Sequence, residues 1–346
     1  MKKLKLLLIF GGQSSEHDIS RLSATSVYQH LNKDLYSISL VGIDKNGVWH
    51  QISTDVNDFK NNDWLKESQI IPDIYNFIKK HDVAFPVLHG LYGEDGSIQG
   101  LFELAKIPYV GCNILSSSLA MDKVFAKKVF EQAHIPQVKS LYIKKRKDGN
   151  IVYVNDFFEE DVNYIKAIEN IIGYPCFIKP SNSGSSVGVN KANNQNELVK
   201  YIDYAAKFDN KILIEESIDG IELECAVIGN DDIKISSVGQ ILPAGDFYSF
   251  ESKYEDANSK TVIPALVEQS IQDTIRELAK RAFRAVDGKG LSRVDFFLDN
   301  KTGNIYLNEV NTLPGFTSIS MYPQLWIHNG LSYLELLDEL IKLALE

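Results

Sequence analysis

The first third of the sequence alternates between two hydrophobic patterns, and this alternation limits the possible folds more than any other feature. Apolar runs typical of buried strands occur at 4–12, 36–44, 82–90 and 107–111, and a helix is predicted at 20–31. Such alternation predicts a parallel sheet with helices on both faces. Ligands of these sheets bind beyond the carboxyl ends of the strands. Two unusual polar stretches, "GGQSSEHDIS" and "HGLYGEDGS", follow the first and third strands.

The rest of the chain predicts two further α+β domains, giving limits of 1–120, 121–213 and 214–346. The second domain has helices at 122–134 and 164–172, a loop at 144–150 and a strand at 174–180 that ends in a polar loop at 181–189. The third has strands at 212–217 and 221–229, a long polar connection at 244–260 and a helix at 271–286. A hairpin at 292–311 and an amphipathic helix at 331–345 complete it.

Composition excludes several classes of protein. A net charge of −10 argues against general binding to nucleic acid or to an anionic membrane. Cys112, Cys176 and Cys225 form no CxxC and lie in apolar contexts, which predicts reduced core residues. The apolar run after Met1 is about half as long as the core of a secretory signal. We therefore expect a cytoplasmic protein.

The second strand of the hairpin at 292–311 ends in oxygen-bearing side chains. Ile305, Leu307, Glu309 and Asn311 are spaced two apart, so on a regular strand they would share one face. That face would run from hydrocarbon into a carboxylate and an amide. The first strand adds Arg293 and Asp295, which are also two apart.

The predicted register of this hairpin pairs Asp295 with Leu307 and Arg293 with Glu309. It puts all the polar groups on one side, and a slip by one residue would separate them. Two carboxylates and an amide form a hard-ligand set suited to Mg²⁺, whose other ligands are usually phosphate and water. The alternative is that Asp295 and Glu309 are solvated residues of a half-exposed sheet.

A magnesium site of this kind implies a phosphate ligand. The chain has neither a GxxxxGK[ST] motif nor a GxGxxG motif, so it is not a P-loop protein and its first sheet is not expected to bind a dinucleotide. Lys179 instead precedes the loop at 181–189, whose glycines and serines let backbone N–H groups approach a phosphate. Lys123 begins a predicted helix, whose N-terminus favours an anion. Alternatively, both are solvated lysines beside a linker.

The order of "FGGQSSEHDIS", "FPVLHGLYGEDGSIQG", "MDK", "IKPSNSGSSVG", "SRVDFFL" and "NEVNTLPGFTSISMYP" resembles that of ATP-grasp enzymes. More closely, the chain is similar to the D-alanine–D-alanine ligases over essentially its whole length. The resemblance implies a first D-alanine activated by ATP to an acyl phosphate, followed by attack of the amine of a second D-alanine. It also implies a role in peptidoglycan precursor synthesis.

The resemblance assigns roles residue by residue. The implied metal ligands are Asp295, Glu309 and Asn311, holding two Mg²⁺ ions or Mn²⁺ in their place. The implied ATP-binding residues are Lys123, Lys179, Ser185, Ser186, Val187, Glu215, Glu222 and Lys253, with Glu215 facing the adenine and Glu222 the ribose. The implied catalytic residues are Glu16, Ser185, Tyr254, Arg293, Gly315 and Ser320, and the implied substrate-binding residues also include His89 and Lys253.

Within this set, Glu16 would bind the ammonium group of the first D-alanine, and His89 would lie beside that substrate. Arg293 and the Gly315 N–H would form an oxyanion hole.

Two further implied roles concern the second substrate. Ser320 and Lys253 would bind its carboxylate. Tyr254, on a connection long enough to be a lid, would hydrogen-bond towards Ser185 and Glu16 and favour an amine acceptor over a hydroxy acid.

Alternative functions stay open at this stage. D-serine is a competing acceptor, although several D-alanyl-D-serine ligases have arginine where this chain has Met321. Another ATP-grasp ligase or carboxylase and a non-catalytic nucleotide-binding regulator are the other candidates. The resemblance further implies a homodimer whose small-molecule substrates are ATP and D-alanine.

Overall fold

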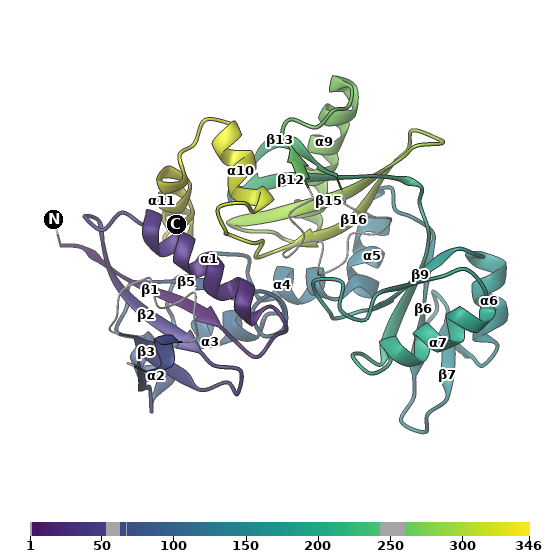
Figure 1. Cartoon of the computed structure of the whole chain (residues 1–346), viewed down its shortest axis with the longest axis horizontal. Coiled ribbons are helices and arrows are strands. Elements are labelled where there is room, and N and C mark those ends of the chain that lie inside the picture. Colours follow the sequence, from purple (N-terminus) through teal and green to yellow (C-terminus); the bar gives the residue numbers. More distant parts are fainter. Residues whose placement is uncertain (1, 53–62, 67, 243–259) are drawn as a thin grey trace.

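The computed structural model describes residues 2–52, 63–66, 68–242 and 260–346. Three sheets form three lobes, which follow one another along the chain from purple through teal to yellow (Figure 1). Cys112, Cys176 and Cys225 are buried and free, as predicted. In the described part of the chain, no helix is long and apolar enough to cross a membrane.

The N-terminal sheet has the order β4-β3-β2-β1-β5. Its strands β2, β1 and β5 are parallel, as predicted, but β3 and β4 are antiparallel to their neighbours, so the sheet is mixed. The short link at 44–48 between β2 and β3 cannot make a parallel crossover. The strand predicted at 107–111 is a single bridge between Tyr109 and Ala84. The elements are β1 (Leu4–Gly11), α1 (His17–His30), β2 (Tyr36–Ile43), β3 (Trp49–Ile52), η2 (Asp63–Leu65), β4 (Ser68–Ile70), α2 (Ile74–Ile78), β5 (Val83–Val87), α3 (Ser97–Ala105) and α4 (Ile114–Met121).

The central sheet has the order β10-β9-β11-β6-β7-β8. One face packs its isoleucines against α6 and α7, and the other carries Lys179, Leu213 and Glu215. Because β11 belongs to this sheet, the predicted domain limit after residue 213 falls inside a strand. The elements are α5 (Lys123–Gln132), β6 (Ser140–Lys145), β7 (Ile151–Val154), β8 (Glu160–Asp161), α6 (Tyr164–Ile171), β9 (Cys176–Pro180), β10 (Asn190–Ala192), α7 (Gln195–Ala205) and β11 (Lys211–Glu216).

The C-terminal sheet is antiparallel, with the order β14-β13-β12-β15-β16. The predicted helix at 271–286 forms as α9 and covers one face, and α10 contacts β12 and β13. A capping box at Ser332 and Glu335 begins the last helix. The elements are β12 (Gly220–Ile228), β13 (Lys234–Leu242), β14 (Lys260–Val262), α9 (Gln269–Ala285), β15 (Leu291–Asp299), β16 (Ile305–Asn311), α10 (Met321–His328) and α11 (Tyr333–Ala344).

The hairpin of β15 and β16 contains a β-bulge that the sequence pattern does not reveal. Phe296 pairs with Leu307, but Asp295 pairs with Glu309, so Asn308 is an extra residue. Because Asp295 and Phe296 are neighbours on one strand, they point to opposite faces. Their partners Glu309 and Leu307 therefore lie on opposite faces too. The prediction that Leu307 and Glu309 share a face is wrong.

The bulge also corrects the predicted register. Asp295 faces Glu309 and Arg293 faces Asn311, in place of the predicted pairs of Asp295 with Leu307 and Arg293 with Glu309. Without the extra residue, the pairing of Phe296 with Leu307 would continue as Asp295 with Asn308. The carboxylates of Asp295 and Glu309 would then lie on opposite faces. The bulge thus brings the four polar side chains together as two successive cross-strand pairs.

The N- and C-terminal lobes share one hydrophobic core. Helix α11 packs against α1 and β5 (Figure 1), and the core includes Phe85 of the first lobe with Phe316 and Tyr322 of the last. Phe85 meets Phe316 edge-on, with ring centroids 6.0 Å apart. This shared core places the segment after β16 against the carboxyl ends of β1 and β5.

Candidate active site

Four polar side chains of β15 and β16 lie together on one face of the hairpin, at the end away from its turn. Arg293 donates to Asp295 through Nε (2.8 Å) and Nη2 (2.7 Å), and the amide of Asn311 donates to Asp295 Oδ2 (2.9 Å). Glu309 is the cross-strand partner of Asp295, and its Oε2 lies 3.5 Å from Nζ of Lys123. The structure thus gathers the predicted metal ligands at one place.

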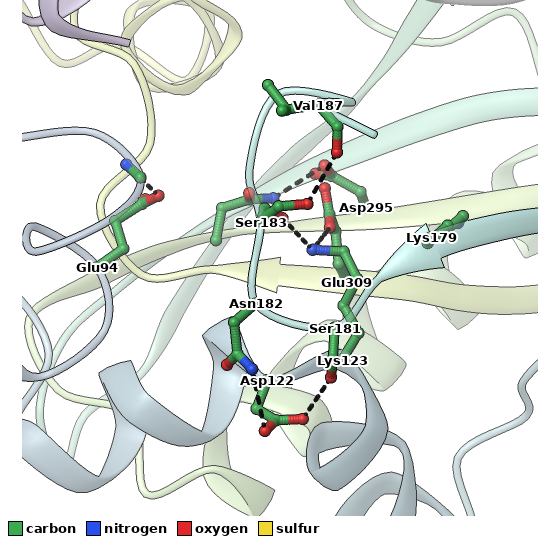
Figure 2. Close-up of polar contacts among 12 residues, drawn as sticks. Glu94, Asp122, Lys123, Lys179, Ser181, Asn182, Ser183, Val187, Asp295 and Glu309 are labelled. Carbon is green, nitrogen blue, oxygen red and sulfur yellow. Dashed lines mark hydrogen bonds and ion pairs between the residues drawn. The ribbon is translucent and has the colours of Figure 1, made fainter. Parts of the chain in front are cut away.

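Glu224 adds a third carboxylate to this cluster. It faces Asp295 from β12, and its Oε2 lies 3.0 Å from Nε of Arg293. Arg293 is therefore held between Glu224 and Asp295, both largely buried. Glu309 lies beside Lys123 and the loop at 181–189 (Figure 2).

The donor set fits a hard cation that keeps outside ligands. Asp295, Glu309 and Asn311 offer two carboxylates and an amide, the ligand type that Mg²⁺ prefers. Among the described residues, no group of three or more His, Cys, Asp and Glu side chains could hold a metal ion. These side chains therefore do not make a closed cage, and a magnesium ion here would need oxygens from phosphate and water.

Two of the predicted phosphate lysines lie in different surroundings. Lys123 begins α5, and its Nζ donates to the Ser183 carbonyl at 2.7 Å, beside Glu309. Lys179 Nζ lies 2.6 Å from Glu215 Oε2, and Lys127 Nζ lies 2.7 Å from Glu215 Oε1. Burial raises the pKa of Glu215, but the two lysine charges outweigh it and lower the pKa to about 2.

The loop at 181–189 is tied to the start of α5 and to the first lobe. Ser181 donates to Asp122, the N-cap of α5, at 2.6 Å, and Ser183 donates to the Val187 carbonyl at 3.0 Å. Ser185 donates to the carboxylate of Glu16 in the first lobe. Figure 2 shows Ser183 and Val187 beside Asp295 and Glu309. The loop therefore covers the hairpin end, which suits its predicted role over a phosphate.

Two serines of this loop have unusual backbone conformations. Ser185 and Ser186 have φ values of 47° and 59°, in the left-handed region that non-glycine residues rarely adopt. Such conformations cluster at ligand sites. These serines are the ones predicted to belong to the phosphate loop.

In the first lobe, Glu16 lies in a space that only glycines leave open. A Cβ at Gly90 would lie 2.5 Å from Glu16 Oε2, and one at Gly184 would lie 2.8 Å from it. Glu94 stands nearby and accepts the Gly90 N–H at 3.0 Å. Burial and the charge of Glu16 raise the pKa of Glu94 to about 8. The two neighbouring carboxyl groups of Glu16 and Glu94 suit an ammonium ligand.

The turn after β16 brings Gly315 against Ser320. A Cβ on Gly315 would lie 2.9 Å from Ser320 Oγ, and this hydroxyl also accepts the Thr317 N–H at 2.9 Å. Ser320 is the N-cap of α10. Glu222 lies on β12, two residues before Glu224. Lys253 and Tyr254 lie outside the described residues.

Comparisons with known proteins agree with this arrangement. A family model described as the D-ala D-ala ligase N-terminus matches residues 5–112, and one described as the D-ala D-ala ligase C-terminus matches residues 130–342. The chain is 46% identical to the D-alanine–D-alanine ligase of Acetivibrio thermocellus, over 99% of this chain and 96% of that protein. The chain belongs to the D-alanine–D-alanine ligase family. Its identity to the relative from Ruminiclostridium cellulolyticum is 47%, over 100% of this chain and 96% of that one.

Solved structures show that the fold is that of this ligase family. A D-Ala:D-Ser ligase from Enterococcus faecalis superposes with a TM-score of 0.87 at 36% identity, covering 99% of this chain and 100% of that one. The D-alanine–D-alanine ligase of Coxiella burnetii has a TM-score of 0.85 at 32% identity, covering 100% and 94%. The predicted family and fold class are confirmed.

Sequence reasoning missed several polar residues of this candidate site. Lys127 follows Lys123 by one helical turn, and Glu224 follows Glu222 by two strand positions, so both signals were available in the spacing. Glu94 lies inside the quoted "HGLYGEDGS" stretch, and nothing in its spacing singles it out. Ser23 has no local signal, because its partners are distant in the sequence.

Proposed function

We propose that this protein joins two molecules of D-alanine into D-alanyl-D-alanine with ATP, for peptidoglycan precursor synthesis. A carboxylate oxygen of the first D-alanine attacks the γ-phosphorus of ATP, the bond to the β,γ-bridging oxygen breaks, and ADP leaves. The amine of the second D-alanine then attacks the acyl carbon of the D-alanyl phosphate. It loses a proton, and inorganic phosphate leaves with the electron pair of the broken C–O bond.

The observation that carries this proposal is the cross-strand pair of Asp295 and Glu309, next to Lys123 and under the loop at 181–189. Magnesium held by Asp295, Glu309 and Asn311 would supply charge neutralisation for the triphosphate. Phosphoryl transfer depends mainly on positioning and electrostatic stabilisation, so no nucleophilic side chain is required.

The first substrate and ATP approach each other between the lobes. Glu16 would bind the ammonium group of the first D-alanine, with His89 beside it. Lys123 and Lys179 would bind the phosphates, assisted by Ser185, Ser186 and Val187. The burial of Glu215 between two lysines holds Lys179 on the face of the central sheet that bears the site. The proposal also includes a contact of Glu215 with the adenine and of Glu222 with the ribose.

Charge develops on the acyl oxygen when the second amine attacks. Arg293 and the Gly315 N–H would stabilise this oxygen. The bonds from Arg293 to Asp295 hold the guanidinium plane in place before the substrates arrive. Ser320 and Lys253 would bind the acceptor carboxylate, and Tyr254 would close the site towards Ser185 and Glu16.

The acceptor needs an argument of its own, because a D-Ala:D-Ser ligase has a closely similar structure. The residue after Ser320 is Met321, which is buried and packs towards Gly239. It brings no hydrogen-bond donor for a hydroxyl group, which supports D-alanine. The remaining parts of the proposal are two bound Mg²⁺ ions, replaceable by Mn²⁺, a homodimer and a cytoplasmic location.

Product identification tests the proposal directly. The protein is incubated with ATP, Mg²⁺ and equal amounts of D-alanine, D-serine and D-lactate, and products are separated by mass. The expected product is D-alanyl-D-alanine, with phosphate release that depends on D-alanine. D-alanyl-D-serine as the main product would replace the acceptor assignment. Phosphate release that ignores D-alanine, or none at all, would overturn the ligase and favour a nucleotide-binding regulator.

A further inference from the structure

The turn that carries Gly315 belongs to the last lobe but is held by the first. The N–H of Leu313 donates to Glu94 Oε1 at 3.1 Å, and the carbonyl of Leu313 lies 3.0 Å from Nδ1 of His89. Both polar groups of Leu313 are therefore bound by the loop that follows β5. This contact joins residues that are more than two hundred positions apart in the sequence.

A second contact holds the other side of the same turn. Ser23, on α1, lies with its Oγ 3.0 Å from Nε2 of His89, and this Oγ accepts the Phe316 N–H at 3.2 Å. Ser23 is fully buried and His89 is almost fully buried. Pro314 and Gly315 thus lie between Leu313 and Phe316, and each of these two is bonded to the N-terminal lobe.

The partners determine which atoms carry the protons. A carbonyl can only accept, so Nδ1 of His89 must donate to Leu313, and Nε2 is then the acceptor of a neutral ring. Burial lowers the pKa of His89, which favours this neutral form. The Ser23 hydroxyl consequently donates to His89 and accepts from Phe316. The donors on Leu313, His89, Ser23 and Phe316 each have an acceptor in this set of contacts, so the arrangement is specific.

We propose that Ser23 and His89 form a clamp that positions the Gly315 N–H for the proposed reaction. Glycine has no side chain of its own to hold it, so the peptide groups on either side set where its N–H points. The clamp is anchored on the lobe that also carries Glu16. It therefore sets the distance between the oxyanion donor and the first substrate, on which the proposed function depends. Ser23 is fully buried, so it acts as a positioning residue.

The test compares Ser23→Ala with a matched variant elsewhere. Ser236 is also a fully buried serine that accepts a backbone N–H, from Ala226 at 2.9 Å, and donates to a backbone carbonyl, of Ser237 at 2.7 Å. Ser236→Ala should thus cost similar stability without touching the turn. If Ser23→Ala fails to fold, Ser23→Cys, whose thiol is a weaker donor and acceptor, is compared in its place.

Two readouts are expected to separate these variants. Ser23→Ala should lower kcat by about ten- to a hundredfold with KM for ATP changed less than about twofold, because misplaced catalytic groups cost rate more than binding. Amide exchange at Gly315 and Phe316 should be faster by about tenfold or more, since the Phe316 N–H loses its acceptor. Ser236→Ala should leave both quantities within about twofold of the parent protein.

The outcomes distinguish the clamp from the proposed function. Unchanged kcat and unchanged exchange in Ser23→Ala would overturn the clamp while leaving the ligase intact. An equal loss of kcat in both serine variants would also overturn it, since the loss would then be a general effect of destabilisation. If the parent protein makes no dipeptide, the proposed function fails, and the exchange measurement still decides whether Ser23 holds the turn.

Discussion

Two clusters of buried charge in this protein have opposite compositions. In the central lobe, one carboxylate, Glu215, lies between Lys127 and Lys179. In the C-terminal lobe, one cation, Arg293, lies between Glu224 and Asp295. The first cluster has an excess of positive charge and the second of negative charge. A magnesium–triphosphate complex carries both signs of charge. Its anionic oxygens would suit the lysines, and its cation would suit the carboxylates.

The comparison also shows a difference in how closely the charges are paired. Both carboxylate oxygens of Glu215 are within 2.7 Å of a lysine nitrogen, so the protein itself supplies partners for this carboxylate. Glu309 lies 3.5 Å from Lys123, a longer contact, and its side chain is 24% exposed. We expect the first cluster to contribute mainly to stability and the second mainly to catalysis.

The largest effect should come from Glu309→Gln, which removes a charge from the negative cluster. Turnover should fall by about a hundredfold or more, because charge stabilisation is lost at the phosphoryl-transfer step. The midpoint of urea unfolding should change little. Turnover is measured over a range of Mg²⁺ concentrations, with Glu277→Gln on the exposed side of α9 as the control. Near-normal turnover at limiting Mg²⁺ would contradict the metal site.

Glu215→Gln should mainly affect stability. The substitution leaves Lys127 and Lys179 close together in a buried place without a compensating charge, and such losses cost about 3–5 kcal/mol in the free energy of unfolding. Urea unfolding at neutral pH measures this change. The parent protein should also lose stability as the pH falls from about 4.5 towards 2, since the pKa of Glu215 is lowered to about 2. A variant as stable as the parent would show that the cluster does not contribute to folding.

Glu94 should show the opposite dependence on pH. Its pKa is raised to about 8, so the folded protein without ligands keeps a proton that the unfolded chain releases above about 4.5. Stability should therefore fall as the pH rises between these values. Glu94→Gln cannot titrate, and its stability should fall less over the same range. Parallel curves for the two proteins from pH 5 to pH 8 would show that Glu94 is already ionised in the fold.

The sequence predicted elements whose pattern is local. Helix α5, strand β9 with its polar loop and the terminal helix α11 all follow from hydrophobic spacing and end signals. The hairpin pattern also predicted that Asp295, Glu309 and Asn311 come together, although through cross-strand pairs that the bulge shifts. The antiparallel pairing of β3 with β2 was missed, because the apolar pattern of β2 is compatible with a parallel or an antiparallel neighbour.

Features that depend on register or on distant contacts could not be predicted. In the sequence, Asn308 looks like an ordinary strand residue. The bulge that it forms nevertheless decides which face of the hairpin Glu309 occupies. The partnership of Ser23 with Phe316 spans 293 positions and involves a backbone N–H, which no side-chain pattern encodes. Such contacts follow only from how the first and last lobes pack together.

The smallest effect should come from an ion pair that lacks burial. Lys301 lies in the turn between β15 and β16, and its Nζ is 3.7 Å from Oδ2 of Asp219. The two side chains are 76% and 66% exposed. Water screens such a pair, so Lys301→Gln should change the free energy of unfolding by less than about 1 kcal/mol and leave turnover unchanged. Urea unfolding and the phosphate-release assay measure the two quantities. A loss of stability as large as that of Glu215→Gln would mean that burial does not explain why the clusters contribute more to stability than surface ion pairs.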